Sequence, residues 1–259
     1  MVLTVSTYGN LEILEGKFSY KVTSISSNNN TSATLLDSGN LVLRNGNSDI
    51  LWESFDYPTD TLLPGMKIGH DKRSGKTWSL VSWRSTEDPG LGDFSLEHDP
   101  DESSQIFNLQ GPNRFWNSGM WDGQIFSQVP EMRLLSFNEN ESYFTYSFHD
   151  PSILSRVVVD VSGQVRKLKW HEGTHEWHLF WLQPKIQCEI YAYCGPFGTC
   201  TRDSLEFCEC LPGFEPRFPE DWNLQDRSGG CVRKADLQCV DPAFRLSAFS
   251  TRWRARLLF

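Results

Sequence analysis

The seven cysteines of this chain are confined to one short segment near the carboxyl end. They run from Cys188 to Cys239, and the long stretch before Cys188 contains none. A segment of that length is too small to bury a large apolar core, so its dense cysteines predict stabilisation by disulfides. The pattern therefore indicates a chain made of two unlike parts and folded in an oxidising compartment.

Zinc is the competing explanation for closely spaced cysteines. Structural zinc sites favour cysteine pairs roughly two to four residues apart, repeated as knuckles. The successive gaps here are five, five, seven, one, twenty and seven residues, which disfavours zinc. The spacing resembles that of an EGF-like module, in which a Cys-x-Cys step joins the fourth and fifth half-cystines. The acidic lead-in of calcium-binding modules does not precede Cys188, and we predict no metal and no cofactor.

The resemblance to an EGF-like module also implies a pairing of the cysteines. The implied disulfides are Cys188–Cys200, Cys194–Cys208 and Cys210–Cys231. The spacing by itself allows many other connectivities. Cys239 is left over, and an odd cysteine in a secreted chain indicates a missing partner.

Length and charge bound the remaining possibilities. A chain of 259 residues with 39% hydrophobic content is long enough for two or three domains with a sizeable core. The formal net charge of -9 argues against a nucleic-acid partner, which requires a basic face to neutralise phosphates. No run approaches the roughly 18 apolar residues that a membrane span needs, so we predict no span in this chain.

The sequence features that bear on secretion point in two directions. The first ten residues, MVLTVSTYGN, have neither a basic region nor a continuous apolar core, so no export signal is visible. The cysteines favour secretion, as do glycosylation sequons at Asn29, Asn30 and Asn140. We resolve the conflict by expecting a truncated amino terminus and a secreted or extracellular protein.

Short β-rich runs separated by glycine and proline predict an all-β body. Residues 79–83, 142–148 and 157–161 have strand-like composition, and the last run begins a predicted hairpin with Ser162-Gly163 as a two-residue turn. A Gly-Asn turn before an alternating strand occurs at Gly9 and again at Gly39, which suggests repeated sheets. The many tryptophans of the middle third are expected mainly to pack.

Several longer motifs occur in a fixed order between about residue 5 and Cys239. They are ATLLDSGNLVLR (33–44), LWESFDYPTDTLLPGMK (51–67), WRS (83–85), YCGPFG (193–198), CECLPGFEP (208–216) and GCVRK (230–234). With these motifs the chain strongly resembles the ectodomains of plant S-locus glycoproteins and S-domain (G-type lectin) receptor-like kinases.

This resemblance implies a domain order. A partial bulb-type lectin β-prism is expected over residues 1–75, and a second lectin-like S-locus glycoprotein domain over 76–186. An EGF-like module is expected over 187–232, followed by the start of a PAN domain and a divergent tail over 233–259. The rest of the PAN domain, the membrane helix and the kinase of the receptors are expected to be missing, and with them the partner of Cys239.

The mannose-binding motif of bulb lectins is degenerate in this chain. That motif, Gln-x-Asp-x-Asn-x-Val-x-Tyr, satisfies sugar hydroxyls with amide, carboxylate and phenol groups. Asn40 and Val42 match it, but Ser38 replaces the aspartate, and the copy at Gly9-Asn10 is equally degenerate. Because a site built on hydrogen bonds loses affinity when its hydrogen-bonding side chains are replaced, we expect weak or no carbohydrate binding.

Neither of two enzyme signatures is supported by the surrounding sequence. Residues 171–175 match His-Glu-x-x-His, which in zinc peptidases lies on a helix, but Gly173-Thr174 between strand-like runs predicts a turn, and no third ligand is evident. The His-Arg-Asp and Asp-Phe-Gly sequences of kinases are absent. We predict that the chain is not an enzyme.

The resemblance implies recognition of another molecule. In the family, variable segments of the S-locus region bind small cysteine-rich proteins, one outcome being recognition of pollen, and the matching residues here are about 126–147 and 170–184. We expect Phe126, Arg133 and Trp177 to act as exposed anchors. Receptor-like kinases of the same family are further expected partners. The alternatives are a secreted carbohydrate-binding lectin and a non-functional truncated gene product.

Overall fold

The computed structural model describes residues 1–25, 30–46, 49–99, 105–123, 126–129, 135–137, 140–147, 150, 152–202 and 207–235. They form mainly short β-strands, with one α-helix among them, α1 (Pro219–Asn223). The chain divides into two compact units, Met1–Tyr191 and Ala192–Phe259. In the described part, no helix is long and apolar enough to cross a lipid bilayer. The all-β prediction is confirmed.

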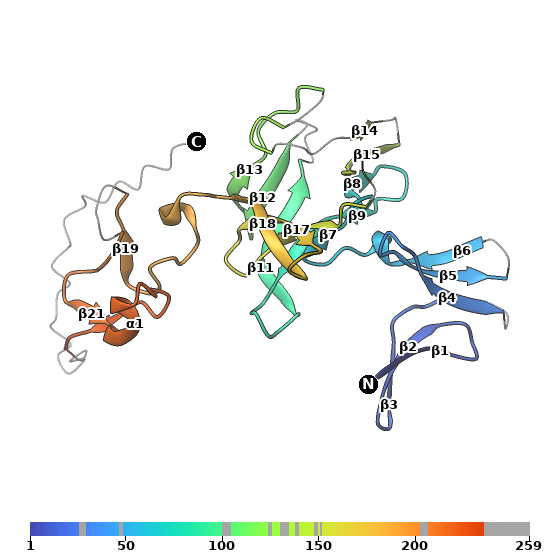
Figure 1. The fold of residues 1–259 in the computed structure, drawn as a ribbon, viewed down its shortest axis with the longest axis horizontal. Helices are drawn as coiled ribbons and strands as arrows, with labels where there is room; N and C mark the ends of the chain where they lie inside the picture. Colours follow the sequence, from blue (N-terminus) through green and yellow to red (C-terminus); the bar gives the residue numbers. More distant parts are fainter. Residues whose placement is uncertain are drawn as a thin grey trace, which may run out of the picture. The chain divides into compact units, whose positions relative to one another are not determined.

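The first six strands form two small antiparallel sheets, coloured blue in Figure 1. The first sheet contains β1 (Val2–Val5), β2 (Leu11–Glu15) and β3 (Phe18–Lys21). The second contains β4 (Thr31–Leu35), β5 (Leu41–Asn45) and β6 (Asp49–Glu53), and the 3-10 helix η1 (Ser54–Asp56) follows it. In each sheet the middle strand in sequence is also the central strand in space.

Both small sheets are built on the same turn, as the Gly-Asn repeat predicts. Gly9 has a φ of 79° and Gly39 a φ of 86°, a left-handed backbone that glycine adopts without steric cost. The Gly9 N–H donates to the Ser6 carbonyl over 2.9 Å, and the Gly39 N–H donates to the Leu36 carbonyl over 2.8 Å. The sequence repeat is therefore also a structural repeat.

Strands β7 to β18 form three four-stranded antiparallel sheets, which we call the three-sheet body. One sheet contains β7 (Thr61–Leu62), β16 (Ser155–Val159), β17 (Val165–His171) and β18 (Glu176–Gln183). Another contains β8 (Ile68–Asp71), β9 (Thr77–Trp78), β14 (Leu135–Phe137) and β15 (Glu141–Phe144). The third contains β10 (Leu80–Trp83), β11 (Leu91–His98), β12 (Ile106–Gln110) and β13 (Asn113–Asn117).

The three-sheet body begins earlier in the chain than the expected boundary after residue 75. Leu62 of β7 pairs with Val157 of β16, and Ile68 of β8 pairs with Phe144 of β15. Strands β7 and β8 therefore belong to the sheets of this body, and sheet pairing crosses the boundary expected from the sequence. The pairing joins segments far apart in the sequence, so local composition does not reveal it.

One apolar core joins the three sheets. Apolar side chains alternate along the strands, as Val157 and Val159 do in β16, because one face of each sheet is buried. Burying one large apolar side chain contributes about 1.5–3 kcal/mol to stability. The buried cluster consists of Leu62, Met66, Ile68, Leu80, Phe94, Leu96, Ile106, Phe126, Val129, Phe144, Tyr146, Val157, Val159, Val165 and Trp181.

The predicted hairpin is formed by β16 and β17, but its turn is longer than two residues. The Asp160 carboxylate accepts hydrogen bonds from the Ser162 N–H (2.9 Å), the Ser162 hydroxyl (2.6 Å) and the Gln164 N–H (3.0 Å). Gly163 then takes a φ of 76°. Because the Asp160 side chain takes over these local hydrogen bonds, the strand ends at Val159, two residues before the predicted end.

The second compact unit has much less regular structure. We call its described residues, 192–202 and 207–235, the cysteine module. It contains β19 (Gly198–Cys200), β20 (Cys208–Cys210), β21 (Phe214–Pro216), β22 (Cys231–Arg233) and helix α1, which form two two-stranded sheets and one turn of helix. The 3-10 helix η2 (Gln187–Glu189) precedes it.

Candidate functional site

A cleft of about 570 Å³ lies beside Trp177, and we call it the Trp177 cleft. Its walls come from segments far apart in the sequence: the Gly-Asn turn before β5, the loop after β7, the segment between β15 and β16, and β18. The lining residues are Asp37, Ser38, Gly39, Leu63, Pro64, Gly65, Ser147, Asp150, Ile153, Leu154, Ser155 and Trp177. Most of the surface that they expose to the cleft is apolar.

Gly39 fixes one wall of the cleft. A Cβ atom added to Gly39 would lie 2.8 Å from Cδ1 of Leu63, closer than such atoms approach in real structures. The turn therefore packs directly on the end of the Leu63 side chain, and its positive φ favours glycine.

A buried tyrosine, Tyr146, forms a hydrogen bond with a residue that lines the cleft. The Tyr146 hydroxyl donates to the Leu62 carbonyl over 3.2 Å and lies 3.2 Å from the hydroxyl of Ser155, a lining residue. Burial disfavours the phenolate and raises the pKa of Tyr146 to about 12, although the bond with Ser155 acts in the opposite direction. These bonds connect β7 with the start of β16.

Two carboxylates, from Asp37 and Asp150, flank the apolar surface. The Asp150 carboxylate accepts hydrogen bonds from the Ser152 hydroxyl (2.7 Å) and the Ser152 N–H (2.9 Å). These bonds, with a smaller contribution from the Lys169 charge, hold the pKa of Asp150 below its usual range. Asp150 therefore stays ionised at physiological pH and makes this edge of the cleft acidic.

Trp177 provides the aromatic wall. Its ring packs edge-on against Trp170, with 5.5 Å between the centroids, and the Arg156 guanidinium lies 4.4 Å from its centroid. These contacts hold the half-buried indole in place while part of it faces the cleft. Of the two predicted anchors within the described residues, Trp177 lines this cleft and Phe126 does not.

The prediction for Phe126 is wrong. Its side chain is 1% exposed, and its ring packs on Phe144 (4.7 Å between centroids) and Trp121 (5.0 Å) within the core. A large apolar side chain in a loop is stabilised more by entering the core than by facing water. Arg133 lies outside the described residues.

The residues of the degenerate sugar motif make contacts within the protein. Asn40 Nδ2 donates to Oε2 of Glu53 over 2.8 Å, and Asn40 Oδ1 accepts from the Ser54 hydroxyl (3.1 Å) and the Phe55 N–H (3.2 Å). Val42 is fully buried, and the Ser38 hydroxyl accepts the Asn40 N–H over 3.3 Å. The Asn40 amide is therefore engaged by the fold.

The His-Glu-x-x-His sequence lies at a hairpin tip and not on a helix. His171 ends β17, residues 172–175 form the turn, and Glu176 begins β18. The His175 ring lies near Trp170, at 6.3 Å between centroids, whereas His171 stacks on His178 at 5.0 Å. The predicted turn is confirmed, and the two histidines of the motif are not paired as a zinc peptidase requires.

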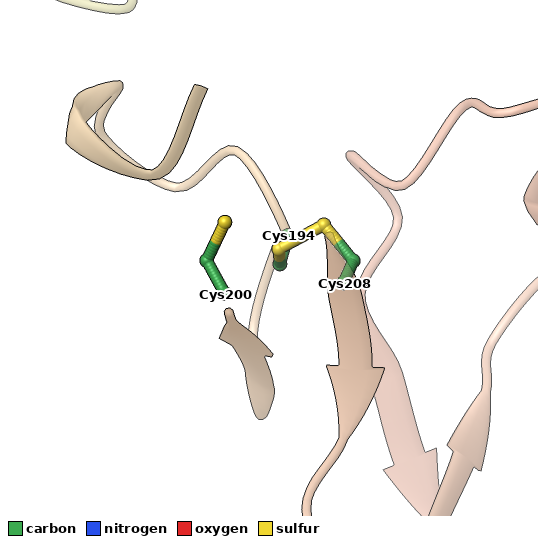
Figure 2. A group of neighbouring side chains, drawn as sticks. All are labelled: Cys194, Cys200 and Cys208. Atoms are coloured by element: carbon green, nitrogen blue, oxygen red, sulfur yellow. A yellow bond between two sulfur atoms is a disulfide. The ribbon is translucent and has the colours of Figure 1, made fainter. Parts of the chain in front are cut away.

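Disulfides account for the close sulfur atoms of the cysteine module. Cys194 is bonded to Cys208, as Figure 2 shows beside Cys200, and Cys200 is disulfide-bonded as well. The three sulfur atoms lie within 4.8 Å of one another. Because zinc binds thiolates and a disulfide sulfur is not a thiolate, this grouping is not a zinc site in the oxidised protein.

Three further cysteines, Cys188, Cys210 and Cys231, are also disulfide-bonded. Cys210 is bonded to Cys231, and Cys188 is also disulfide-bonded. The two bonds with known partners have the connectivity that the EGF-like resemblance implies, while the partner of Cys188 stays a prediction. Cys239 lies outside the described residues.

The predicted glycosylation sites differ in accessibility. Asn30 is exposed, so a glycan at this residue would meet no packing obstacle. Asn140 is half-buried, and Ser142 of its sequon is 2% exposed. Asn29 lies outside the described residues. Of the two candidates within the described residues, Asn30 is the more accessible.

Most of the Trp177 cleft could not be predicted from the sequence. Leu63, Ile153 and Leu154 are ordinary apolar residues of short loops, and nothing in the linear sequence indicates that they share a surface. Asp150 carries a local signal that was not used, because Asp-x-Ser spacing is typical of a side chain that bonds to the backbone two residues on.

Comparison with known proteins gives two family matches. The model of the D-mannose binding lectin family matches residues 1–84, and that of the S-locus glycoprotein domain matches residues 116–218. A G-type lectin S-receptor-like serine/threonine-protein kinase of Arabidopsis thaliana is 48% identical over 260 residues, covering 92% of this chain and 31% of the relative.

Two further relatives resemble the same part of the family. An S-locus-specific glycoprotein of Brassica oleracea var. alboglabra is 38% identical, covering 82% of this chain and 52% of the relative. A putative inactive G-type lectin S-receptor-like serine/threonine-protein kinase SRK of Arabidopsis thaliana is 37% identical, and the match covers 82% of this chain and 41% of the relative. The chain thus spans between 31% and 52% of the length of these three relatives, and this matched part contains no kinase domain.

Proposed function

The chain belongs to the plant family of S-locus glycoproteins and S-domain (G-type lectin) receptor-like kinases, and from this premise we propose that it is a non-catalytic, extracellular recognition unit for a protein or peptide ligand. The observation that carries the proposal is the Trp177 cleft, an apolar surface with an indole wall and acidic edges. Concave surfaces with a few polar groups and an aromatic anchor are typical of binding sites.

The lining of the cleft favours a particular ligand chemistry. Leu63, Ile153 and Leu154 favour an apolar side chain, because contact with them removes apolar surface from water. Asp37 and Asp150 favour a neighbouring lysine or arginine through charge complementarity. The proposed ligand is a small cysteine-rich protein or peptide that presents an aromatic or aliphatic residue beside a basic one.

The extracellular setting of the proposal rests on the cysteine module. Its bonded cysteines need an oxidising compartment to form and persist. The exposed sequon at Asn30 is consistent with passage through the secretory pathway. Receptor-like kinases of the same family are proposed as further partners, and recognition of pollen as one process that such a protein would serve.

Weak or absent carbohydrate binding is part of the same proposal, despite the lectin match. The sugar motif lacks its aspartate, and the Asn40 amide bonds to Glu53, Ser54 and Phe55. A sugar at this position would have to displace those bonds, which costs about 1–3 kcal/mol for each buried group left unsatisfied.

Selection of peptides tests the proposed ligand chemistry. A phage-displayed library of disulfide-constrained peptides is selected against the oxidised chain, and the enriched peptides are measured by surface plasmon resonance. We expect an aromatic or aliphatic residue next to lysine or arginine. Trp177→Ala and Asp150→Asn are each expected to weaken binding by about tenfold or more, as loss of an interface anchor does.

The chain offers matched controls for both variants. Trp83→Ala removes an exposed tryptophan, 37% exposed, that does not line the cleft. Asp226→Asn changes a carboxylate that also bonds a serine hydroxyl (2.6 Å) and N–H (3.0 Å), in the cysteine module. Both controls should bind like the unmodified chain. Absence of enriched peptides, or equal binding by folded cleft and control variants, would refute the proposal, and strong glycan-array binding would favour the lectin alternative.

A further inference from the structure

The sheet of β7, β16, β17 and β18 has one face that points away from the core, and we call it the outer face. Val157 and Val159 of β16 point into the core, so Arg156 points the opposite way. Residues directly opposite one another on paired strands share a face. Arg156 is opposite Leu168, which is opposite Leu179, so these three side chains form a row across the outer face.

The outer face is more apolar than a sheet surface in contact with water usually is. Antiparallel sheets commonly carry polar side chains on a solvent-facing side. Here Leu179 is 50% exposed, and the other apolar side chains are half-buried. The apolar residues of the outer face are Val158, Leu168, Trp170, Trp177 and Leu179. A contiguous apolar surface that remains accessible to solvent marks an interaction site.

The outer face continues the Trp177 cleft. Trp177 and Leu154 both line the cleft, and Leu154 is 49% exposed. The Leu154 carbonyl accepts the Trp170 N–H over 2.9 Å, and Trp170 is directly opposite Trp177. A ligand that fills the cleft therefore meets the outer face at its next contacts.

Arg156 gives this surface a positive charge that is not paired with a carboxylate of the described residues. Its guanidinium lies over the Trp177 ring, 4.4 Å from the centroid, and its buried Nε donates no hydrogen bond to a described residue. Arg166 on the same face differs, because its Nε lies 2.7 Å from Oδ2 of Asp160. A guanidinium held flat on an aromatic ring presents its donors in a fixed fork, which fits a carboxylate.

We propose that Arg156 binds a carboxylate of the ligand, from an aspartate or glutamate side chain, and that the ligand extends from the Trp177 cleft across the outer face. This inference rests on the proposed function, because it concerns the same ligand. It adds an acidic residue to the apolar and basic residues that the cleft favours. Arg156 is then a residue that determines specificity, through charge complementarity with the ligand.

Peptide selection from two libraries tests the inference. Both libraries present disulfide-constrained peptides to the oxidised chain, and the second lacks aspartate and glutamate. We expect the complete library to yield peptides with an acidic residue. Peptides from the acid-free library should bind about tenfold more weakly or not at all, since they leave the guanidinium unpaired.

A double-mutant cycle separates recognition from a structural role of Arg156. A selected acidic peptide is compared with its amide analogue, in which glutamine replaces the acid, by surface plasmon resonance. Arg156→Gln should weaken the acidic peptide about tenfold and change binding of the amide analogue by less than about twofold. Arg84→Gln is the matched control, because Arg84 is an exposed arginine paired with Asp88 outside the sheet. It should bind both peptides like the unmodified chain.

Leu179→Ser tests whether the ligand reaches across the outer face. It should weaken both peptides about threefold or more, because an apolar contact is lost. Leu91→Ser changes a leucine of β11 that is 75% exposed, and it should leave binding unchanged.

The outcomes distinguish this inference from the proposed function. Acid-free peptides that bind as tightly as acidic ones would overturn the inference and leave the proposed function standing. Equal weakening of both peptides by Arg156→Gln would also overturn it, since Arg156 would then only hold Trp177 in place, and unchanged binding by Leu179→Ser would remove the contact across the outer face. Failure of both libraries to enrich any peptide would refute the proposed function and this inference with it.

Discussion

The three-sheet body and the cysteine module are held together by different forces. In the body, apolar side chains from three sheets meet in one core, and the chain contains no cysteine before Cys188. In the described part of the module, the buried apolar side chains are half-cystines, those of Cys194, Cys208 and Cys231. The difference follows from size, because a short segment cannot bury enough apolar surface to offset the entropy of the unfolded chain.

This difference predicts that each region fails under its own conditions. Reduction of the disulfides should unfold the module and leave the body folded. Truncation of a core side chain should destabilise the body and leave the disulfides intact. A cooperative unfolding transition of the body would also speak against the alternative that the chain is a non-functional product.

Reduction of the disulfides is expected to have the largest effect. Loss of a native disulfide from a small domain costs about 2–5 kcal/mol and often abolishes folding. After dithiothreitol treatment, hydrogen exchange followed by mass spectrometry should show β19, β20, β21 and β22 without protection and β10 to β13 unchanged. Protection retained in the reduced module would contradict the comparison, as would unfolding of the body along with it.

Phe126→Ala should have the next largest effect, because it opens a cavity among Phe144, Trp121 and their neighbours. Such a truncation costs about 3–5 kcal/mol, which urea denaturation followed by tryptophan fluorescence measures. Tyr8→Ala, at a residue that is 77% exposed, is the control and should change stability little. Unaltered stability of Phe126→Ala with lost ligand binding would restore Phe126 as a surface anchor.

The two Gly-Asn turns provide a test within the small sheets. Asn10 accepts hydrogen bonds from the Thr23 hydroxyl (3.2 Å) and the Ile25 N–H (2.8 Å), much as Asn40 accepts from Ser54 and Phe55. Asn10→Ala and Asn40→Ala should each destabilise the chain by about 1–3 kcal/mol, since buried partners lose their bonds.

Asn45→Ala, at an exposed strand end, is the control for these two variants. Thermal unfolding followed by circular dichroism compares all three. If Asn40→Ala unfolds like the control and yet loses glycan binding, Asn40 belongs to a sugar site and its role in the fold has been overestimated.

The smallest predicted effect is a loss of stability at alkaline pH. The pKa of Tyr146 is about 12 in the folded protein and about 10 in an unfolded chain. The contribution of this raised pKa to the free energy of unfolding is complete below pH 10. It declines as pH rises towards 12, because the unfolded state then releases the phenol proton first. The decline is about 1 kcal/mol per pH unit above 10.

Tyr146→Phe isolates this contribution. The variant should be slightly less stable at neutral pH, having lost the bonds to Leu62 and Ser155, and its stability should fall less steeply above pH 10. Urea midpoints at pH 9, 10 and 11 measure both effects. Parallel pH profiles for the two proteins would mean that the Tyr146 hydroxyl is not buried as described.

Local signals predicted the local structure of this chain well. The Gly-Asn repeat and the hairpin at 157–170 depend on turn chemistry that only glycine and short polar side chains provide, so the sequence shows them directly. The Asp160 side chain still changed the length of one turn, because its hydrogen bonds compete with strand pairing. Side-chain competition of this kind is harder to foresee than the turn itself.

Nonlocal features were largely beyond sequence analysis. The pairing of β7 with β16 and the burial of Phe126 depend on segments that meet only in the folded chain. The Trp177 cleft is of the same kind, since the sequence placed Ser38 in a sugar motif and Trp177 in a ligand segment and did not indicate that they line one cleft. A residue's type predicts that it is apolar or charged, but its neighbours decide whether it faces the core or a ligand.

If the chain is the extracellular recognition unit that we propose, its small module depends on disulfides. Peptide mapping of the native protein, isolated from tissue without reductant, tests it most directly. We predict linked peptides for Cys194–Cys208, Cys210–Cys231 and Cys188–Cys200, together with a glycan at Asn30. Native material with all of these thiols free, or with a metal ion held by them, would contradict the account.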